Sequence, residues 1–406
     1  MEWKLKDLTV DGKGSYGIGA PAVPYQEDKL TYLRITDIND DGSLNFYDLK
    51  SVDAEDAEKY ILKENDIVFA RTGNSTGRSY FYEKQHGTFV YAGFLIKFSL
   101  DPNKVNPRIL KYYTHSKPYF DWVNSFDTGA TRGNINAKTY GDMEIELPSR
   151  KVQDKIVSIL SSLDRKIELN NKINADLEEM AQAIFKNWFV DFEPFKDGKF
   201  VNSELGMIPE GWKVGRADDF YQINIGKTPP RKEHKWFSTN PADKIWVSIA
   251  NMGNSGIFIS DSSEYLTKEA VDRHNIIMVP RNTILLSFKL TVGRVAIADK
   301  ELTTNEAIAR FILSDDKYME YLYLYLKNFD YNSLGSTSSI ATAVNSKTIK
   351  GMQMLQPSDK IIDAFHIQVN PIFEKIRSLT KENSRLSTLR DTILPRLMSG
   401  ELEVPE

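Results

Sequence analysis

Two segments of the chain carry apolar residues at the spacing of a helix–helix seam. The first segment contains Ile156, Leu160, Leu163, Ile167, Asn170, Asn174, Leu177, Met180 and Ile184. The second contains Phe365, Val369, Ile372, Ile376, Leu379, Asn383, Leu386, Leu389 and Ile393. In each ladder the steps are mostly of three and four residues, which is typical of a coiled-coil seam. Every position of the second ladder lies 209 residues after its counterpart in the first (365 − 156 = 393 − 184 = 209), so the pattern predicts two long helices that are copies of each other.

The repeat extends far beyond the two helices. Trp3-Lys4-Leu5 returns as Trp212-Lys213-Val214, and residues 136–149 (NAKTYGDMEIELPS) return as residues 345–358 (NSKTIKGMQMLQPS), both at the same distance as the ladders. Between these anchors the distance is slightly larger, as for Gly77-Arg78 and Gly293-Arg294. A repeat of this length indicates two copies of one module, with insertions that differ between the copies.

The two helices are expected to pack against each other, because an amphipathic helix cannot bury its apolar stripe alone. An antiparallel pair of helices, each about 50 Å long over residues 153–187, would place one globular region at each end and give the chain a pseudo-two-fold axis. In the alternative, each helix packs only on its own globular region. The predicted interface residues are Leu160, Leu163, Ile167, Asn174, Leu177, Val369, Ile372, Ile376, Asn383 and Leu386. Because Asn recurs at 174 and 383, an asparagine pair is expected to set the register of the seam.

Each globular half combines strand and helix patterns. Residues 66–70, 89–100 and 283–288 are rich in β-branched and aromatic residues and are bounded by turn residues, which predicts strands. Residues 107–125 and 317–328 are helix candidates. We therefore predict an α+β fold with four parts: a globular domain over residues 1–150, a helix over 151–198, a second globular domain over 199–358 and a second helix over 359–406.

Composition narrows the class of protein only slightly. The chain has 406 residues, no cysteine and a net charge of −4. These values fit two or three globular domains in a reducing compartment, and they argue against a uniformly basic nucleic-acid binder. The first residues lack the apolar stretch of a secretory signal, and no apolar run reaches the length of a membrane span. We therefore expect a cytoplasmic protein without a membrane partner.

The motifs that suggest catalysis are incomplete. Gly226-Lys227-Thr228 has the wording of the end of a phosphate-binding loop, but Tyr221 replaces the required first glycine, and Pro229 and Pro230 oppose a helix after the lysine. The five histidines show no metal-ligand spacing. These observations predict a chain without catalytic, metal or cofactor sites of its own.

Polar, cationic loops are the better candidates for a functional surface. Residues 70–83 (ARTGNSTGRSYFYE) follow a predicted strand, and their counterpart is 287–297 (SFKLTVGRVAI). A second loop, 128–139 (TGATRGNINAKT), and a third cluster around residues 227–235 add further cations. Glycine allows close approach to phosphates, and arginine donates to phosphate or guanine. Solvated turns remain the alternative for each loop. The candidate DNA-binding residues are Arg71, Thr72, Asn74, Thr76, Arg78, Arg132, Asn134, Lys138, Lys227, Arg231, Lys289 and Arg294.

Several of these stretches together resemble the specificity subunit of type I restriction–modification systems. The resemblance is carried by 131-TRGNINAKTYGDMEIELPSRKVQDKIVSILSSLDRKIELNN-171, 188-WFVDFEP-194, 205-LGMIPEGWKV-214, 66-DIVFARTGNSTGR-78 and 393-ILPRLMSGEL-402. It covers nearly the whole chain. The second copy departs from the pattern, because residues 338–344 replace the TRGNI wording and Phe288-Lys289 replaces Thr72-Gly73.

The resemblance implies a function for each part of the chain. Each globular half would be a target recognition domain that reads one part of a bipartite, gapped double-stranded DNA sequence, and the helices would be spacers of an antiparallel coiled coil. Two methyltransferase (M) subunits would dock on them, with restriction (R) subunits added. S-adenosylmethionine, ATP and Mg would act on those partner subunits and not on this chain. Two other interpretations stay open: a structural coiled-coil scaffold without DNA contact, and a fused restriction–modification enzyme.

Overall fold

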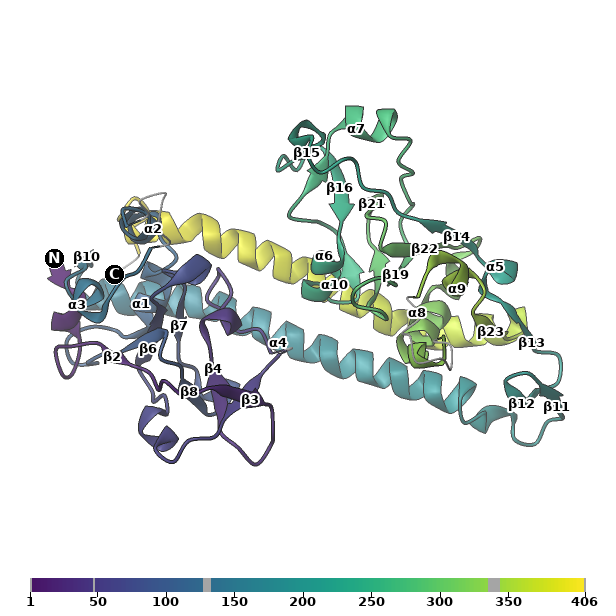
Figure 1. The fold of residues 1–406 in the computed structure, drawn as a ribbon, viewed down its shortest axis with the longest axis horizontal. Helices are drawn as coiled ribbons and strands as arrows, with labels where there is room; N and C mark the ends of the chain where they lie inside the picture. The colour runs from purple at the N-terminus through teal and green to yellow at the C-terminus, as the bar shows by residue number, and fades with distance from the viewer. Residues whose placement is uncertain (1, 47, 127–132, 335–343, 405–406) are drawn as a thin grey trace. The chain divides into compact units, whose positions relative to one another are not determined.

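The computed structural model describes residues 2–46, 48–126, 133–334 and 344–404. The chain divides into two compact units (Figure 1). Unit 1 consists of Met1–Ile167 and Arg385–Glu406, and unit 2 consists of Glu168–Ser384. Each unit therefore contains parts of both long helices, together with one globular region.

The two long helices are confirmed. Helix α4 (Arg150–Phe189) and helix α10 (Asp359–Met398) each have 40 residues, and Figure 1 shows each of them uninterrupted. The first and last residues of α10 are the repeat counterparts of the first and last residues of α4. The structure thus ends both helices at equivalent positions of the repeat.

The helices pack together in both units. In unit 1, Ile156 and Leu160 near the start of α4 share a buried cluster with Leu394 and Leu397 near the end of α10. In unit 2, the ring of Phe189 at the end of α4 lies 4.8 Å from that of Phe365 near the start of α10. The start of each helix therefore pairs with the end of the other, so the helices run antiparallel.

The predicted interface residues differ in their burial. Leu160, Val369 and Ile376 are buried, whereas Leu163, Ile167, Leu177, Ile372 and Leu386 are half-buried. Beyond these, each helix also packs on globular parts of the chain. The alternative in which a helix packs only on its own globular region is therefore wrong.

The polar contact of the seam is not the one that the repeat suggests. Asn170 donates from Nδ2 to Oδ1 of Asn383 (2.8 Å), and Asn383 donates to Oδ1 of Asn171 (2.7 Å). Oδ1 of Asn174, the copy of Asn383, is buried and has no hydrogen-bond partner in the described part of the chain. In an antiparallel pair, a residue of one helix lies opposite its repeat counterpart only at the symmetry axis. At every other place along the helices, each residue faces a residue that is not its counterpart.

The described residues of unit 1 contain short helices and ten short strands around two sheets. The helices are α1 (Arg108–Tyr113), α2 (Lys117–Asn124) and α3 (Ala137–Gly141). The strands are β1 (Glu2–Lys4), β2 (Ser15–Tyr16), β3 (Ala22–Pro24), β4 (Thr31–Leu33), β5 (Lys50–Val52), β6 (Asp66–Ala70), β7 (Ser79–Phe81), β8 (Phe89–Tyr91), β9 (Leu95–Ser99) and β10 (Glu144–Glu146). One sheet has the order β2-β9-β6-β7, the other has the order β3-β5-β4-β8, and β1 pairs with β10.

The strand over residues 66–70 is confirmed, but two other predicted elements are divided. Residues 89–100 form two strands because β8 pairs with β4 in one sheet and β9 pairs with β6 in the other. The chain changes sheets between them. Residues 107–125 form α1 and α2, with Pro118 in the first turn of α2, where a missing backbone N–H is tolerated.

Unit 2 repeats the plan with additional elements. Its further helices are α5 (Ala217–Phe220), α6 (Ile249–Asn254), α7 (Lys268–Arg273), α8 (Met319–Asn328) and α9 (Ser346–Lys350). Its strands are β11 (Phe200–Ser203), β12 (Gly206–Pro209), β13 (Lys213–Arg216), β14 (Gln222–Ile225), β15 (Phe237–Ser238), β16 (Lys244–Val247), β17 (Phe258–Ile259), β18 (Tyr265–Leu266), β19 (Ile284–Ser287), β20 (Val295–Ala298), β21 (Thr303–Thr304), β22 (Ile308–Ile312) and β23 (Gln353–Gln356). The sheets have the orders β14-β22-β19-β20-β17 and β15-β18-β16-β21, with β11-β12 and β13-β23 as separate pairs.

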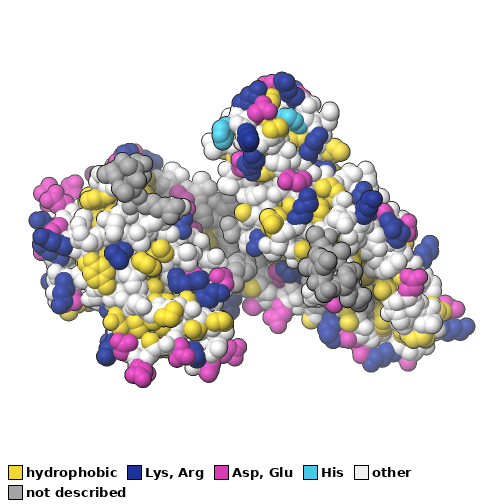
Figure 2. Space-filling view, viewed as in Figure 1, with side chains coloured by type: hydrophobic (Ala, Val, Ile, Leu, Met, Phe, Trp, Pro, Cys, Tyr) yellow, Lys and Arg dark blue, Asp and Glu magenta, His cyan; other side chains and the backbone are white. Residues whose placement is uncertain are grey.

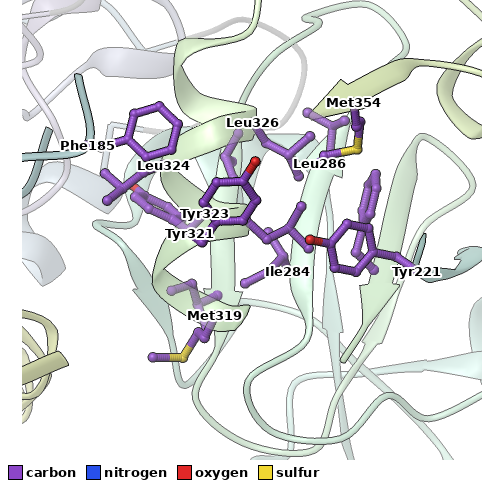
Figure 3. Close-up of a cluster of buried hydrophobic side chains, with 14 of the residues drawn as sticks. Phe185, Tyr221, Ile284, Leu286, Met319, Tyr321, Tyr323, Leu324, Leu326 and Met354 are labelled. Atoms are coloured by element: carbon purple, nitrogen blue, oxygen red, sulfur yellow. The ribbon is translucent and has the colours of Figure 1, made fainter. Parts of the chain in front are cut away.

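The largest core of unit 2 lies where α8 packs between the sheet and the long helices. Figure 3 shows Tyr321 and Tyr323 of α8 close to Phe185 of α4 and to Ile284 and Leu286 of β19. The hydroxyl of Tyr323 donates to Glu178 of α4 at 3.0 Å. Phe373 of α10 belongs to the same cluster. The helix pair and the globular region of unit 2 thus share one core.

Buried charges also join each globular region to the long helices. In unit 1, Asp164 of α4 pairs with Lys111 of α1 and Arg390 of α10, both at 3.1 Å. In unit 2, Asp299 at the end of the β20 strand pairs with Arg377 and Lys381 of α10, both at 3.2 Å. In unit 1 the long helices supply the carboxylate and one of its cations, whereas in unit 2 α10 supplies both of these cations.

Candidate nucleic-acid interface

The described part of the second predicted loop, residues 133–139, lies against the first predicted loop in unit 1, and residues 128–132 of that prediction lie outside the described residues. Thr72 and Asn134 form an isolated antiparallel bridge, and the N–H of Ile135 donates to the carbonyl of Arg71 at 3.0 Å. Thr76 Oγ1 donates to the carbonyl of Gly133 at 2.8 Å. These bonds hold residues 133–135 against the loop that follows β6, so the two loops form one surface.

The second loop is fixed by its own helix. Asn136 caps α3 by accepting from the N–H of Thr139 (2.9 Å), as Asn345 caps α9 in unit 2. Such a side-chain cap satisfies a backbone N–H that the first helical turn leaves unpaired. Tyr140 of α3 then donates to the carbonyl of Ala70 at the end of β6 (2.9 Å), which joins the helix to the strand that bears the first loop.

Arg71 lies at the centre of this surface between two exposed aromatic rings. Its guanidinium carbon is 5.3 Å from the ring centre of Tyr16 and 5.8 Å from that of Phe94, and Nε donates to the carbonyl of Gly93 (3.4 Å). Tyr16 is 45% exposed and Phe94 is 55% exposed. Among the described residues, no carboxylate lies within ion-pair distance of Arg71. Its charge is therefore oriented by neutral groups and stays available to an anion.

Arg78 and Arg294, in contrast, are engaged in holding the fold. Arg78 pairs with Asp40 (2.7 Å) and donates to the carbonyl of Ile38 (3.0 Å). Arg294, its counterpart in the second copy, donates to the carbonyl of Ile249 (2.8 Å). The arginine fastens the turn after a central strand to a neighbouring loop in the first copy and to the start of α6 in the second, so a structural role accounts for its recurrence.

The remaining candidates of unit 1 have different positions. The side chains of Asn74, Asn134 and Lys138 are exposed, and those of Thr72 and Thr76 are half-buried. Arg132 lies outside the described residues. Asn74 and Asn134 come from the two joined loops, so they offer exposed amides on the same surface as Arg71.

In unit 2, Lys227 and Arg231 lie around Trp246. Lys227 donates from Nζ to the carbonyl of His274 at 2.5 Å, and its own carbonyl accepts from Nε1 of Trp246 at 3.3 Å. The guanidinium of Arg231 is 4.2 Å from the ring centre of Phe237 and 4.4 Å from that of Trp246. As with Arg71 in unit 1, an arginine thus lies against two aromatic rings.

Carboxylates accompany the cations of unit 2. Arg231 pairs with Glu264 at 2.5 Å. Burial alone would raise the pKa of Glu306, but a hydrogen bond from Thr228 and the charges of Lys289 and Arg231 outweigh burial and lower that pKa. Lys289 and Arg231 therefore lie near the same carboxylate. In Figure 2 the part of unit 2 that contains β15, β16 and α7 shows basic, acidic and histidine side chains close together on its surface.

The segment that resembles a phosphate-binding loop has another structure. The chain continues from β14 through Gly226 without a helix at Lys227. A Cβ on Gly226 would lie 1.9 Å from the carbonyl oxygen of Asn305, and a Cβ on Gly17, its counterpart, would lie 2.3 Å from that of Ala92. Both glycines are thus required by a close approach of two backbones within the fold.

Charge and motifs did not predict four aromatic residues of these surfaces: Tyr16, Phe94, Phe237 and Trp246. Tyr16 precedes the repeated Gly17 loop and Phe94 lies in the turn between two strands, so their nearness to Arg71 depends on sheet pairing.

Among the described residues no group of three His, Asp or Glu side chains could hold a metal ion. In that same part of the chain, every helix is too short or too polar to cross a bilayer.

Comparison with known proteins identifies the family. The model of the type I restriction modification DNA specificity domain matches the chain twice, over residues 18–179 and 209–368. The chain therefore belongs to this family and is a specificity subunit, the non-catalytic component of a type I restriction–modification complex, in which cofactors reside on the modification and restriction subunits.

Two relatives illustrate the similarity. The chain is 27% identical over 408 residues to the type I restriction enzyme HindI specificity subunit of Haemophilus influenzae, covering 85% of this chain and 88% of that protein. It is 31% identical over 307 residues to the MjaIX specificity subunit of Methanocaldococcus jannaschii, covering 73% of this chain and 69% of the relative.

A solved structure supports the fold. The S subunit of a type I restriction–modification system from M. genitalium aligns with all of this chain and 96% of its own, with a TM-score of 0.54 and 14% identity. The mixed α+β fold with two recognition domains and a packed pair of long helices is therefore confirmed.

Proposed function

We propose that this chain recognises a bipartite double-stranded DNA sequence, with each globular half reading one part. The proposed domains are target recognition domains over residues 1–150 and 199–358, with spacer helices over 151–198 and 359–406. The observation that carries the proposal is the joining of the two polar loops of unit 1 around Arg71, whose charge lacks an acidic partner among the described residues. Exposed amides beside an oriented arginine are the groups that contact base edges and phosphates.

The long helices would separate the two recognition domains and dock the partner subunits. An uninterrupted helix of 40 residues is about 60 Å long, whereas successive major-groove half-sites recur about every 34–36 Å. Such a helix pair is long enough to span the gap of a bipartite site. The proposed partners are two methyltransferase subunits and, through them, restriction subunits, in the cytoplasm.

On unit 2, the proposed DNA surface contains Lys227, Arg231 and Lys289. Arg231 lies against two aromatic rings as Arg71 does, which supports equivalent functions in the two halves. The carboxylates beside these cations reduce the positive charge, and they fit a surface on which hydrogen bonds to bases contribute more than attraction to phosphates. Glutamate accepts hydrogen bonds from the amino group of cytosine.

Arg71→Ala in the complex with methyltransferase subunits tests the proposal. The recognised sequence is first identified from the adenines that the complex methylates, and binding is then measured on DNA altered in the first or the second part. We expect about a 5- to 150-fold loss of affinity, corresponding to about 1–3 kcal/mol. If Arg71 contacts a base, discrimination within one part of the site is also lost. If it contacts a phosphate, affinity falls evenly and the salt dependence weakens.

Lys63→Ala is the matched control. Lys63 is exposed and precedes β6, whereas Arg71 follows it, so the two cations lie at opposite ends of a strand about 17 Å long. Equal effects of the two substitutions would contradict the proposed surface. A complex that assembles without any sequence-specific footprint would instead support the scaffold alternative.

A further inference from the structure

The turn between β19 and β20 displays a leucine in a costly position. Leu290 is 99% exposed and has a φ of +60°. An L-residue with a branched side chain rarely adopts this left-handed conformation, because its Cβ crowds the backbone. A fully exposed leucine side chain also contributes none of the free energy that burial of its apolar surface would give.

Hydrogen bonds in the turn hold the leucine in this position. Ser287, which is fully buried, donates from Oγ to the carbonyl of Thr291 (2.6 Å) and accepts from the N–H of Arg294 (3.0 Å). The N–H of Thr291 donates to the carbonyl of Lys289 (2.7 Å). The turn is therefore closed beneath Leu290, which stands at its tip.

The first copy of the module makes the same turn without this cost. Asn65 and Asn282, which precede the central strands β6 and β19, occupy equivalent places in the two copies and have φ values of +69° and +68°. Counting forward equally from both asparagines, the counterpart of Leu290 is Gly73, with a φ of +73°. The alignment on Gly77-Arg78 and Gly293-Arg294 had paired Gly73 with Lys289, because the two copies differ by one residue between this position and the Gly-Arg pair. Glycine adopts this conformation freely. The fold therefore does not require a leucine at this position, and another function has to account for it.

The surroundings of the turn favour DNA over a protein partner. The exposed Lys289 adjoins Leu290, and both Lys289 and Arg231 act on the carboxyl of Glu306. A protein–protein interface contains about 20–30 residues from each partner, and its centre is depleted of charged residues. Leu290 and the 37% exposed Val292 of the same turn form a small apolar surface beside Lys289. An apolar surface of this size fits a DNA groove, where the 5-methyl group of thymine is the apolar feature of the base edges.

We propose that Leu290 is a specificity-determining residue of the second half that contacts the 5-methyl group of a thymine in the major groove. This inference rests on the proposed function of the chain. Lys289 would contact a neighbouring phosphate, and the rigid turn would keep Leu290 in place before binding, so that little conformational entropy is lost on contact.

The test replaces thymines by deoxyuridine, which lacks only the 5-methyl group. The measurement uses the complex with methyltransferase subunits. Replacement of one thymine in the second part of the recognised site should lower the affinity of the wild type about fourfold, the equivalent of about 0.8 kcal/mol. In the Leu290→Gly complex, the same replacement should have no effect. Leu290→Gly should also weaken binding to unmodified DNA by a similar factor.

Stability measurements separate this function from a structural role. Because glycine suits the left-handed conformation, Leu290→Gly should melt no lower than the wild type. Leu205→Gly, which removes another exposed leucine from the turn between β11 and β12, should leave the response to deoxyuridine unchanged.

Three outcomes are distinguishable. If the wild type binds its site specifically but responds to no deoxyuridine replacement, or if Leu290→Gly keeps the response, the inference about Leu290 is wrong. If the wild-type complex shows no sequence-specific binding at all, the proposed function itself fails. Loss of the deoxyuridine response in Leu290→Gly alone supports the inference.

Discussion

Replacing Arg377 by methionine should destabilise unit 2 strongly, because it leaves a buried carboxylate with fewer partners. The side chain of Arg377 is 5% exposed and that of Asp299 is 3% exposed, and Nε and Oδ1 lie 3.2 Å apart. Arg377 also donates to Oδ1 of Asn282 at 2.8 Å, and its guanidinium is 4.4 Å from the ring centre of Phe258. Burial lowers the pKa of Arg377, because removing the charged guanidinium from water is unfavourable.

The expected loss is about 3 kcal/mol. Breaking a buried ion pair from one side costs about 3–5 kcal/mol. The lower end applies here because two cations remain near Asp299, Lys381 at 3.2 Å and Arg281 at 3.5 Å. In addition, the Nε–Oδ1 contact of Arg377 is not aligned as a hydrogen bond. Methionine retains apolar contact with Phe258, so the loss reports mainly on the charge.

Urea unfolding followed by tryptophan fluorescence measures this loss. Four of the six tryptophans, Trp188, Trp212, Trp236 and Trp246, lie in unit 2, so fluorescence reports chiefly on that unit. A loss of about 3 kcal/mol should move the midpoint by about 1 M urea or more. Lys268→Met breaks an exposed pair with Asp272 (3.1 Å) in the same unit and should change the midpoint little. Equal shifts in the two variants would refute the reasoning about burial.

Two further predictions concern unit 1. Burial acts to raise the pKa of Asp164, but the charges of Lys111 and Arg390 outweigh it and lower that pKa below 3.8. This carboxylate therefore stabilises the fold above pH 3.8, and its contribution is lost as pH falls through the lowered pKa. Asp164→Asn should cost about 3 kcal/mol at pH 7 and less at pH 3, as urea titrations at both values would show; a constant difference would contradict this. Leu163→Asp should weaken the helix pair and release methyltransferase subunits in co-purification, whereas Ser158→Asp, on an exposed position of α4, should not; full retention in Leu163→Asp would count against docking on the helices.

Local patterns predicted the regular elements because each depends on near neighbours in the chain. The three- and four-residue steps predicted both long helices, and the strand over residues 66–70 has the predicted bounds. The predicted strand over 89–100 was divided because its two ends pair in different sheets. Hydrophobicity alone does not distinguish one long buried strand from two short ones.

The candidate surface was predicted only in part. The two loops of the first half were found from their glycines, cations and amides, and the structure joins them. The aromatic partners of Arg71 and Arg231 were not predicted. Arg78 and Arg294 make hydrogen bonds within the fold, and their contact with DNA stays a prediction. Whether an arginine is available to a ligand depends on which carbonyls and carboxylates the chain brings near it.

The sequence by itself determined the duplication, the two long helices, the α+β class and the family. All of these follow from the order of residues, because the long internal repeat shows which segments are copies of each other. Only the tertiary structure decided which residues touch: Asn170 with Asn383, Asp299 with Arg377, Arg71 with Tyr16. The physical reason is that a repeat relates equivalent residues, whereas an antiparallel pair of helices and a sheet with crossed connections bring non-equivalent residues into contact.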